Sequence, residues 1–306
     1  MDAVRTQKLV KRYGAAEILH GIDLTVPLGA LFGFLGPNGA GKTTTIRILL
    51  GLLKPTAGGA LVLGHDAWRE GPAARSQIGY LPGDARFYEW LTGGATLDFF
   101  FTARGGRDRS ELNRLVRVFD LHLDLQKRVR SYSRGMKQKL GLIAALMHRP
   151  HLLILDEPTT ALDPLVRQHL FDELQAVVAD GRTVLFSSHT LSEVEQLCDH
   201  VAILGGGRLL EQSTIELLRR RAVRRVEITF APGAAPQALP DGLRRAGHPP
   251  PAGAGALDGV LHAAWVGPVE ALVAWLASQR IRDVSIGPPD LEDLFLAYYE
   301  QSEGAR

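Results

Sequence analysis

The sequence has little of the features that would mark a secreted or membrane-spanning protein. Its 306 residues contain one cysteine, Cys198, which excludes an internal disulfide and a cysteine-based metal site. No apolar run approaches the roughly 20 residues that span a bilayer, and residues 1–14 lack the apolar centre of a signal peptide. We therefore expect a cytosolic chain whose role at any membrane depends on a partner.

A strong imbalance of charge is also missing. The formal net charge is +2, from 35 Lys and Arg residues against 33 Asp and Glu residues, which is small for this length. The composition therefore does not predict a polyanionic partner, and we expect no nucleic acid. With 45% hydrophobic and 22% charged residues, the chain is long enough to form one large globular domain and a smaller one.

Short apolar runs alternate with helical patterns from the start of the chain to about residue 220. This order is typical of a largely parallel sheet covered by helices, so the predicted fold class is α/β. The expected strands are 30–35, 60–63, 152–155, 183–187 and 201–204. Between about 84 and 150 the pattern is mostly helical, which predicts a helical insert.

The composition changes after the basic run at 219–225, where proline, glycine and alanine become frequent. We therefore place a domain boundary near 222, with one domain over 1–221 and a smaller one over 222–306. The smaller domain is expected to be α+β, with strands at 226–230, 259–266 and 281–286 and helices at 269–280 and 290–300. The basic run is interpreted as a solvated helix end and linker, with contact to anionic lipid as the alternative.

Residues 33–50, GFLGPNGAGKTTTIRILL, contain the pattern G-x-x-x-x-G-K-T between an expected strand and an expected helix. Glycines at such a turn let backbone N–H groups surround phosphate oxygens, and the helix N-terminus adds positive potential. Lys42 would reach the β- and γ-phosphates, and Thr43 would place its hydroxyl on Mg²⁺. The predicted nucleotide-binding residues here are Gly36, Pro37, Asn38, Gly39, Ala40, Gly41, Lys42, Thr43 and Thr44.

Two acids follow the buried strand expected at 152–155. Asp156 and Glu157 would lie at its carboxyl end, where ligands bind in open α/β sheets. Asp156 suits a Mg²⁺ contact, and Glu157 could hold and polarise the water that attacks the γ-phosphate. His189 follows another such strand and is a candidate contact to the same phosphate.

In their order along the chain, these motifs resemble the nucleotide-binding subunits of ATP-binding cassette (ABC) transporters, over about residues 4–220. The matching motifs are an aromatic A-loop (Tyr13), Walker A (36–44), a signature motif (132–136), Walker B (152–157), a D-loop (160–163) and a switch histidine (His189). The sequences YSRGMKQKL and PPDLEDLFLAYY, with the added C-terminal domain, are similar to the stand-alone ATPase subunits of drug and antibiotic exporters of the daunorubicin-resistance type.

The resemblance implies a P-loop NTPase core with a helical subdomain, the cofactors ATP and Mg²⁺, and a homodimer that forms on ATP. The signature helix of one chain then faces the γ-phosphate held by the other, with Ser133 donating a hydrogen bond and Gly135 permitting close approach. Arg134 stands where the family has a glycine, and its charge adds to the attraction for phosphate. Tyr13 would stack on adenine, and Asp163 would couple the two sites.

Gly83 is the main departure from the family pattern, which has a glutamine or an acid that contacts Mg²⁺ at this position. Either a water replaces the missing ligand or Asp84 reaches in from the next position. We expect Gly83 to loosen the binding of ATP-Mg²⁺ without abolishing turnover. The residues that follow, 87–97, are expected to contact a membrane subunit.

Two functions compete. The first is an ATPase subunit at the cytoplasmic face of the cell membrane, which powers export of a drug, antibiotic or lipid-like substrate through a separate permease. The alternative is a soluble ABC ATPase that acts on ribosomes or nucleic acid. Translation factors of that kind usually carry two cassettes, so the single uninterrupted cassette here favours transport. The transported substrate and the permease stay open.

Overall fold

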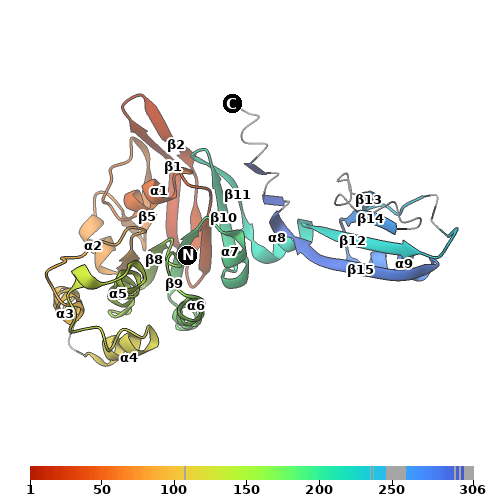
Figure 1. Cartoon of the computed structure of the whole chain (residues 1–306). Helices are drawn as coiled ribbons and strands as arrows, with labels where there is room; N and C mark the ends of the chain where they lie inside the picture. The colour runs from red at the N-terminus through yellow and green to blue at the C-terminus, as the bar shows by residue number, and fades with distance from the viewer. Residues whose placement is uncertain are drawn as a thin grey trace. The chain divides into compact units, whose positions relative to one another are not determined.

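The computed structural model describes residues 1–106, 108–234, 236, 238–245, 260–292, 294–295 and 298–299. The chain forms two compact units, Met1–Gln212 and Ser213–Arg306 (Figure 1). The division falls earlier in the chain than the position near 222 that the composition suggested. Helix α8, Ile215–Arg221, consequently goes with the second unit.

The first unit contains a six-stranded sheet in the order β11-β10-β4-β9-β8-β7. Its strands are β4 (Leu31–Leu35), β7 (Ile78–Leu81), β8 (Leu152–Asp156), β9 (Thr183–Ser188), β10 (His200–Gly205) and β11 (Arg208–Thr214). The pairs from β10 to β7 are parallel, and β4, β8 and β9 are buried along their whole length. Parallel strands covered on both faces read as continuous apolar runs, which is why the sequence predicted the α/β class correctly.

A second, antiparallel sheet in this unit has the order β2-β1-β5-β6, with β3 also paired to β1. Its strands are β1 (Asp2–Tyr13), β2 (Ala16–Ile22), β3 (Thr25–Pro27), β5 (Ala57–Val62) and β6 (His65–Asp66). The strand expected at 60–63 belongs here as β5. Strand β1 was not predicted, because its buried and exposed residues do not alternate regularly, and its register with β2 shifts after Leu9 and Lys11. Both sheets share one core that includes Val4, Phe34 and Ile154.

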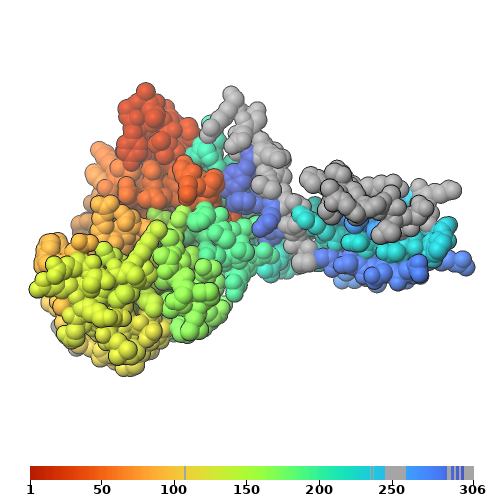
Figure 2. All heavy atoms as spheres, in the orientation of Figure 1, coloured from red at the N-terminus to blue at the C-terminus, as the bar shows by residue number. Residues whose placement is uncertain are grey.

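Helices cover the parallel sheet and form an insert between β7 and β8. They are α1 (Lys42–Leu49), α2 (Gly71–Ser76), α3 (Gly93–Ala103), α4 (Ser110–Val118), the short 3₁₀ helix η1 (Val129–Ser131), α5 (Arg134–Leu146), α6 (Pro164–Ala179) and α7 (Leu191–Leu197). The predicted helical insert is present as α3, α4 and α5, drawn in orange-yellow to green in Figures 1 and 2. Gly141 lets α5 pack closely on β7, since a Cβ there would lie 2.5 Å from a methyl carbon of Leu81.

Besides α8, the described residues of the second unit form a four-stranded antiparallel sheet with helix α9 packed against it, in agreement with the expected α+β composition. Its elements are β12 (Val223–Phe230), β13 (Leu243–Arg245), β14 (Val260–Trp265), α9 (Val269–Ala277) and β15 (Ile281–Asp290), and the strand order is β13-β14-β12-β15. Its core includes Ile228, Trp265 and Leu272. The helix expected at 290–300 falls partly outside the described residues, and β15 extends to Asp290 rather than ending near 286.

The basic run at 219–225 covers the end of α8 and the start of β12. Arg220 forms an ion pair with Glu216 one turn earlier in the helix, and Arg224 donates a hydrogen bond to the backbone oxygen of Gly287 at 3.4 Å. The run is therefore the end of a helix followed directly by the first residues of a strand, where a linker was expected. No helix of the described residues is both long enough and apolar enough to cross a membrane.

Candidate functional site

The turn between β4 and α1 has the backbone that a phosphate-binding loop needs. Gly39 and Gly41 have φ angles of 82° and 104°, in the left-handed region where only glycine is unstrained. A Cβ at Gly36 would lie 2.7 Å from the backbone oxygen of Leu204, so this glycine packs the loop against β10. No side chain caps the start of α1, which leaves its first N–H groups available to an anion.

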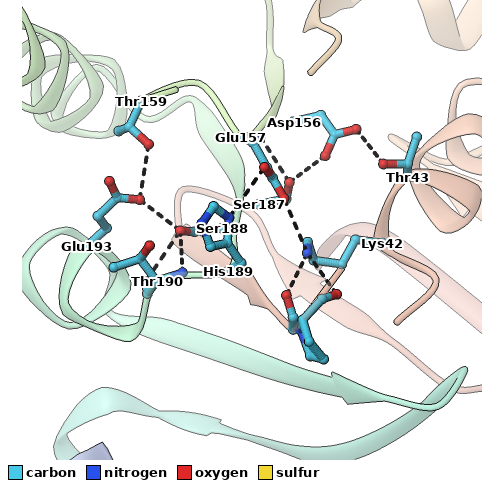
Figure 3. Close-up of polar contacts among 12 residues, drawn as sticks. Lys42, Thr43, Asp156, Glu157, Thr159, Ser187, Ser188, His189, Thr190 and Glu193 are labelled. Atoms are coloured by element: carbon cyan, nitrogen blue, oxygen red, sulfur yellow. Dashed lines mark hydrogen bonds and ion pairs between the residues drawn. The ribbon is translucent and has the colours of Figure 1, made fainter. Parts of the chain in front are cut away.

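Lys42 lies beneath this turn and is 5% exposed. Its Nζ donates hydrogen bonds to the backbone oxygens of Gly36 at 2.6 Å and Pro37 at 3.3 Å, and it lies 3.4 Å from Oε1 of Glu157. Figure 3 shows this ammonium group between the loop and the carboxylate. The positive charge is therefore held at the mouth of the loop, where the terminal phosphates of a nucleotide would lie.

Asp156 and Thr43, the two residues expected to hold Mg²⁺, are in contact. The Thr43 hydroxyl donates to Oδ2 of Asp156 at 2.8 Å, and the Ser187 hydroxyl donates to Oδ1 at 2.6 Å (Figure 3). Asp156 is buried at 3% exposure, so these two hydroxyls fix both of its oxygens. Burial first, and the charge of Asp156 second, raise the pKa of the neighbouring Tyr80 to about 12.

Gly83 lies directly beside Asp156. A Cβ at Gly83 would be 3.3 Å from the backbone oxygen of Asp156 and 3.8 Å from its Oδ2. Asp84, by contrast, forms an ion pair with Arg86 at 2.9 Å, and its side chain is 77% exposed. The Asp84 side chain is therefore turned to solvent.

Glu157 and His189 complete the cluster at the strand ends. Glu157 Oε2 lies 3.3 Å from Nδ1 of His189, while its Oε1 faces Lys42 (Figure 3). The backbone N–H of Glu157 donates to both the backbone oxygen and the hydroxyl of Ser187, each at 3.2 Å. A carboxylate that is held by its backbone and lies beside a lysine can accept a proton from a water placed near the lysine-bound phosphate.

Sequence reasoning missed two residues that brace this cluster. Ser187 bonds Asp156 and Glu157, as described above. Glu193 on α7 accepts hydrogen bonds from Ser188 at 2.8 Å and from Thr159 at 3.1 Å. The paired hydroxyls just before His189 were a visible signal, but Glu193 lies in an ordinary helical pattern and only the fold brings it to Thr159.

Tyr13, Ser133 and Asp163 lie outside this cluster. Tyr13 ends β1 with 49% of its surface exposed, and Lys11 Nζ lies 4.9 Å from its ring centroid. Ser133 caps α5, accepting from Met136 N at 3.2 Å, and both Ser133 and Arg134 are exposed. Asp163 caps α6, and the backbone N–H of Val166 holds its pKa below the usual range.

Gly135 packs closely against the segment that links Glu157 to Asp163. A Cβ at Gly135 would lie 2.6 Å from the backbone oxygen of Ala161. Among the described residues, Tyr13, Ser133 and Asp163 form no hydrogen bond or ion pair with Lys42, Thr43 or Glu157. Within one chain, the phosphate loop and the signature helix are thus separate surfaces.

The described residues contain no group of three or more His, Cys, Asp or Glu side chains that could hold a metal by themselves. Mg²⁺ does not require such a group, because it keeps several waters and is usually bound by one or two carboxylates together with substrate phosphates. Asp156 and Thr43 offer the oxygen ligands that such a site uses.

Comparison with known proteins gives one consistent family. A family model described as ABC transporter matches residues 19–160. The daunorubicin resistance ATP-binding protein DrrA3 of Streptomyces coeruleorubidus is 41% identical over 220 residues, covering 71% of this chain and 70% of that protein. DrrA2 of the same organism, also named a daunorubicin resistance ATP-binding protein, is 35% identical over 304 residues, covering 96% and 94%.

A solved structure described as the ATP binding subunit of an ABC transporter is also similar. It superposes with a TM-score of 0.67 and 32% identity, over 71% of this chain and 92% of that one. Nothing in these comparisons favours the alternative of an ATPase that acts on ribosomes or nucleic acid. The chain therefore belongs to the ATP-binding subunits of ABC transporters, which bind and hydrolyse ATP.

Proposed function

We propose that this chain is the ATPase subunit of a drug or antibiotic exporter, acting through a separate permease at the cytoplasmic face of the membrane. The observation that carries the proposal is the convergence of Lys42, Thr43, Asp156, Glu157 and His189 at the carboxyl ends of neighbouring strands. The similarity to the two daunorubicin resistance proteins over most of the chain supports the substrate class.

In the proposed reaction, the loop at 36–44 binds the phosphates through its backbone N–H groups and the ammonium group of Lys42. Thr43 and Asp156 would hold Mg²⁺, which supplies charge neutralisation on the phosphates when it is bound. Glu157 accepts a proton from the attacking water, and His189 holds the carboxylate from its other side. Tyr13 offers its exposed ring to adenine.

The proposal includes a homodimer in which each chain completes the site of the other. The exposed N-terminus of α5 supports it. In the part of the chain that the structure describes, Ser133 and Arg134 form no hydrogen bond or ion pair with the phosphate loop of the same chain. A helix N-terminus with a hydroxyl and a nearby cation suits a γ-phosphate presented by a second copy. Asp163, exposed at the start of α6, would then couple the two sites.

A groove of about 560 Å³ supports a contact with the permease. It lies between the loop at 83–89 and the start of α5, and its lining includes Arg86, Phe87, Arg134 and Lys137. Beside it, the rings of Tyr88 and Trp90 pack on each other at 4.8 Å and are mostly exposed, as is Phe99. Phe87 is half-buried and packs edge-on against Phe100, so only part of the expected aromatic set is free for a partner.

Fractionation of cells that produce the chain together with its permease tests the proposal. We expect the chain in the membrane fraction, released when the permease is absent, and we expect drug accumulation to rise when Lys42 is replaced by alanine. Recovery of the chain with ribosomes, at a level that does not depend on the permease, would contradict the proposal.

A further inference from the structure

The short segment at 157–163 connects the two parts of the proposed machinery. It begins with Glu157 and ends with Asp163, which caps α6. Glu157 belongs to what we call the phosphate cluster, the group formed by Lys42, Thr43, Asp156, Glu157 and His189. Its own turns are closed by Thr160 N donating to the backbone oxygen of Glu157 at 3.3 Å and by Leu162 N donating to that of Thr159 at 3.1 Å. Any displacement of this segment therefore reaches the carboxylate of Glu157 directly.

Helix α5 holds this segment at two points. The side-chain amide of Gln138 donates a hydrogen bond to the backbone oxygen of Pro158 at 2.9 Å, and Gln138 is 6% exposed. Three residues earlier in the helix, Gly135 packs against the backbone oxygen of Ala161. A buried amide that loses its acceptor leaves an unsatisfied donor, so α5 and Pro158 are expected to move together.

The backbone of the segment needs such support. Glu157 and Ala161 have φ angles of 51° and 62°, in the left-handed region that is unfavourable for residues with a side chain. Glu157 also precedes a proline, which restricts its backbone further. A residue held in a strained conformation keeps it only while its surroundings impose it, and Gln138 binds the next residue along the chain.

We propose that Gln138 is a positioning residue that links the Ser133 end of α5 to the catalytic carboxylate of the same chain. The inference rests on the proposed function, in which Ser133 serves the nucleotide of a second copy. Gln138 lies little more than one turn from Ser133, so the rigid helix carries a displacement of its N-terminus to Pro158. Engagement of one nucleotide thereby sets the position of Glu157 at the other.

Steady-state ATP hydrolysis of Gln138→Ala tests this link. We expect kcat to fall about tenfold and the Hill coefficient for ATP to fall toward 1, while nucleotide affinity of the monomer stays within about twofold. Gln168→Ala is the matched control, because Gln168 is an exposed glutamine on α6 whose side-chain amide donates to Asp172 on the same helix. Its kinetics should equal those of the unmodified chain.

Gln138→Glu keeps the shape of the side chain and carries the test if the alanine variant does not fold. Its carboxylate cannot donate to the Pro158 oxygen, but the protonated carboxyl can. We expect hydrolysis per folded chain, relative to the unmodified chain, to recover as pH falls toward the carboxyl pKa. A loss of packing alone would not produce that pH profile.

Dimer formation separates positioning from simple damage to the helix. Each Gln138 variant is combined with Glu157→Gln, and its mass with saturating ATP and Mg²⁺ is measured by light scattering. Retained dimers with reduced hydrolysis support the inference. Unchanged kcat and Hill coefficient, or loss of the dimer, would overturn it. An unmodified chain that hydrolyses no ATP would instead contradict the proposed function.

Discussion

The phosphate cluster and the N-terminus of α5 differ in how many of their side-chain contacts come from the same chain. In the cluster, Lys42, Asp156 and Glu157 all have partners from the same chain, and two of them are buried. At α5, Ser133 only caps its helix and Arg134 is exposed. The difference indicates that changes in the cluster act within one subunit, whereas changes at Ser133 act only when two subunits meet.

The largest expected effect is that of Glu157→Gln on the cluster. Loss of the proton acceptor should lower ATP hydrolysis by about 10²- to 10⁴-fold, the range typical of a general base. Binding should survive, since Lys42 keeps its bonds to Gly36 and Pro37. Phosphate release and nucleotide affinity measure the two effects. A variant that hydrolysed ATP at the normal rate would remove Glu157 from the proposed reaction.

The cluster was predictable because its signals are local. The loop glycines, Lys42 and the acids after an apolar strand lie within short stretches, and parallel strand order then brings them together. The partners of the bracing residues were not predictable in this way, although the two serines before His189 stand out in the sequence. Ser187 lies 31 residues from Asp156, and Gln138 lies 20 residues from Pro158. Their types fit an ordinary strand or helix, and only tertiary packing gives them a partner.

A change at the N-terminus of α5 should have a smaller effect on hydrolysis, and the effect should appear only when two subunits associate. Ser133→Ala should reduce hydrolysis about 10-fold or more at saturating ATP while ATP binding to the monomer is unchanged, because the hydroxyl serves a nucleotide on the other copy. Hydrolysis is compared with binding of a fluorescent ATP analogue below the concentration at which dimers form.

Ser133→Ala also removes the N-cap of α5, so its control variant must remove the N-cap of another helix. Thr214→Ala qualifies, because Thr214 caps α8 by accepting from Leu217 N at 3.2 Å. Each variant should lose about 1 kcal/mol of folding free energy, but only Ser133→Ala should lose activity. If monomer binding fell in the Ser133 variant, the comparison between the two regions would fail.

A substitution at Gly83 tests how the phosphate cluster binds Mg²⁺. A glutamine at this position would start beside Asp156 and could donate an oxygen ligand toward Mg²⁺, so Gly83→Gln should lower the half-saturating Mg²⁺ concentration by about tenfold. Hydrolysis as a function of free Mg²⁺ is the measurement. Gly59→Gln is the control, since a Cβ at Gly59 meets nothing within 4 Å. Identical Mg²⁺ profiles for Gly83→Gln and the unmodified chain would count against looser ATP-Mg²⁺ binding as the consequence of Gly83.

The smallest expected effect on ATP hydrolysis is at the C-terminal end of α5, where His148 contacts the sheet. Its Nε2 lies 3.3 Å from the backbone oxygen of Ile78, which Arg104 also contacts at 3.1 Å. The pKa of His148 is lowered to about 4, mainly because the side chain is buried and to a smaller extent because Arg104 is positively charged. Below about pH 6.5 the unfolded chain therefore takes up a proton that the folded chain does not bind.

The free energy of unfolding should accordingly fall as pH falls from about 6.5 to about 4, by at most about 3 kcal/mol from this residue. His148→Gln should flatten that part of the pH profile, measured by urea unfolding between pH 4 and 8. His122→Gln is the control variant, because the His122 side chain is about half exposed. Ser133 and His148 lie at opposite ends of α5, so hydrolysis per folded dimer near pH 7 should be the same in both variants. A loss of hydrolysis in His148→Gln alone would contradict this. It would show that the contact of His148 with the sheet affects the end of α5 that faces the partner.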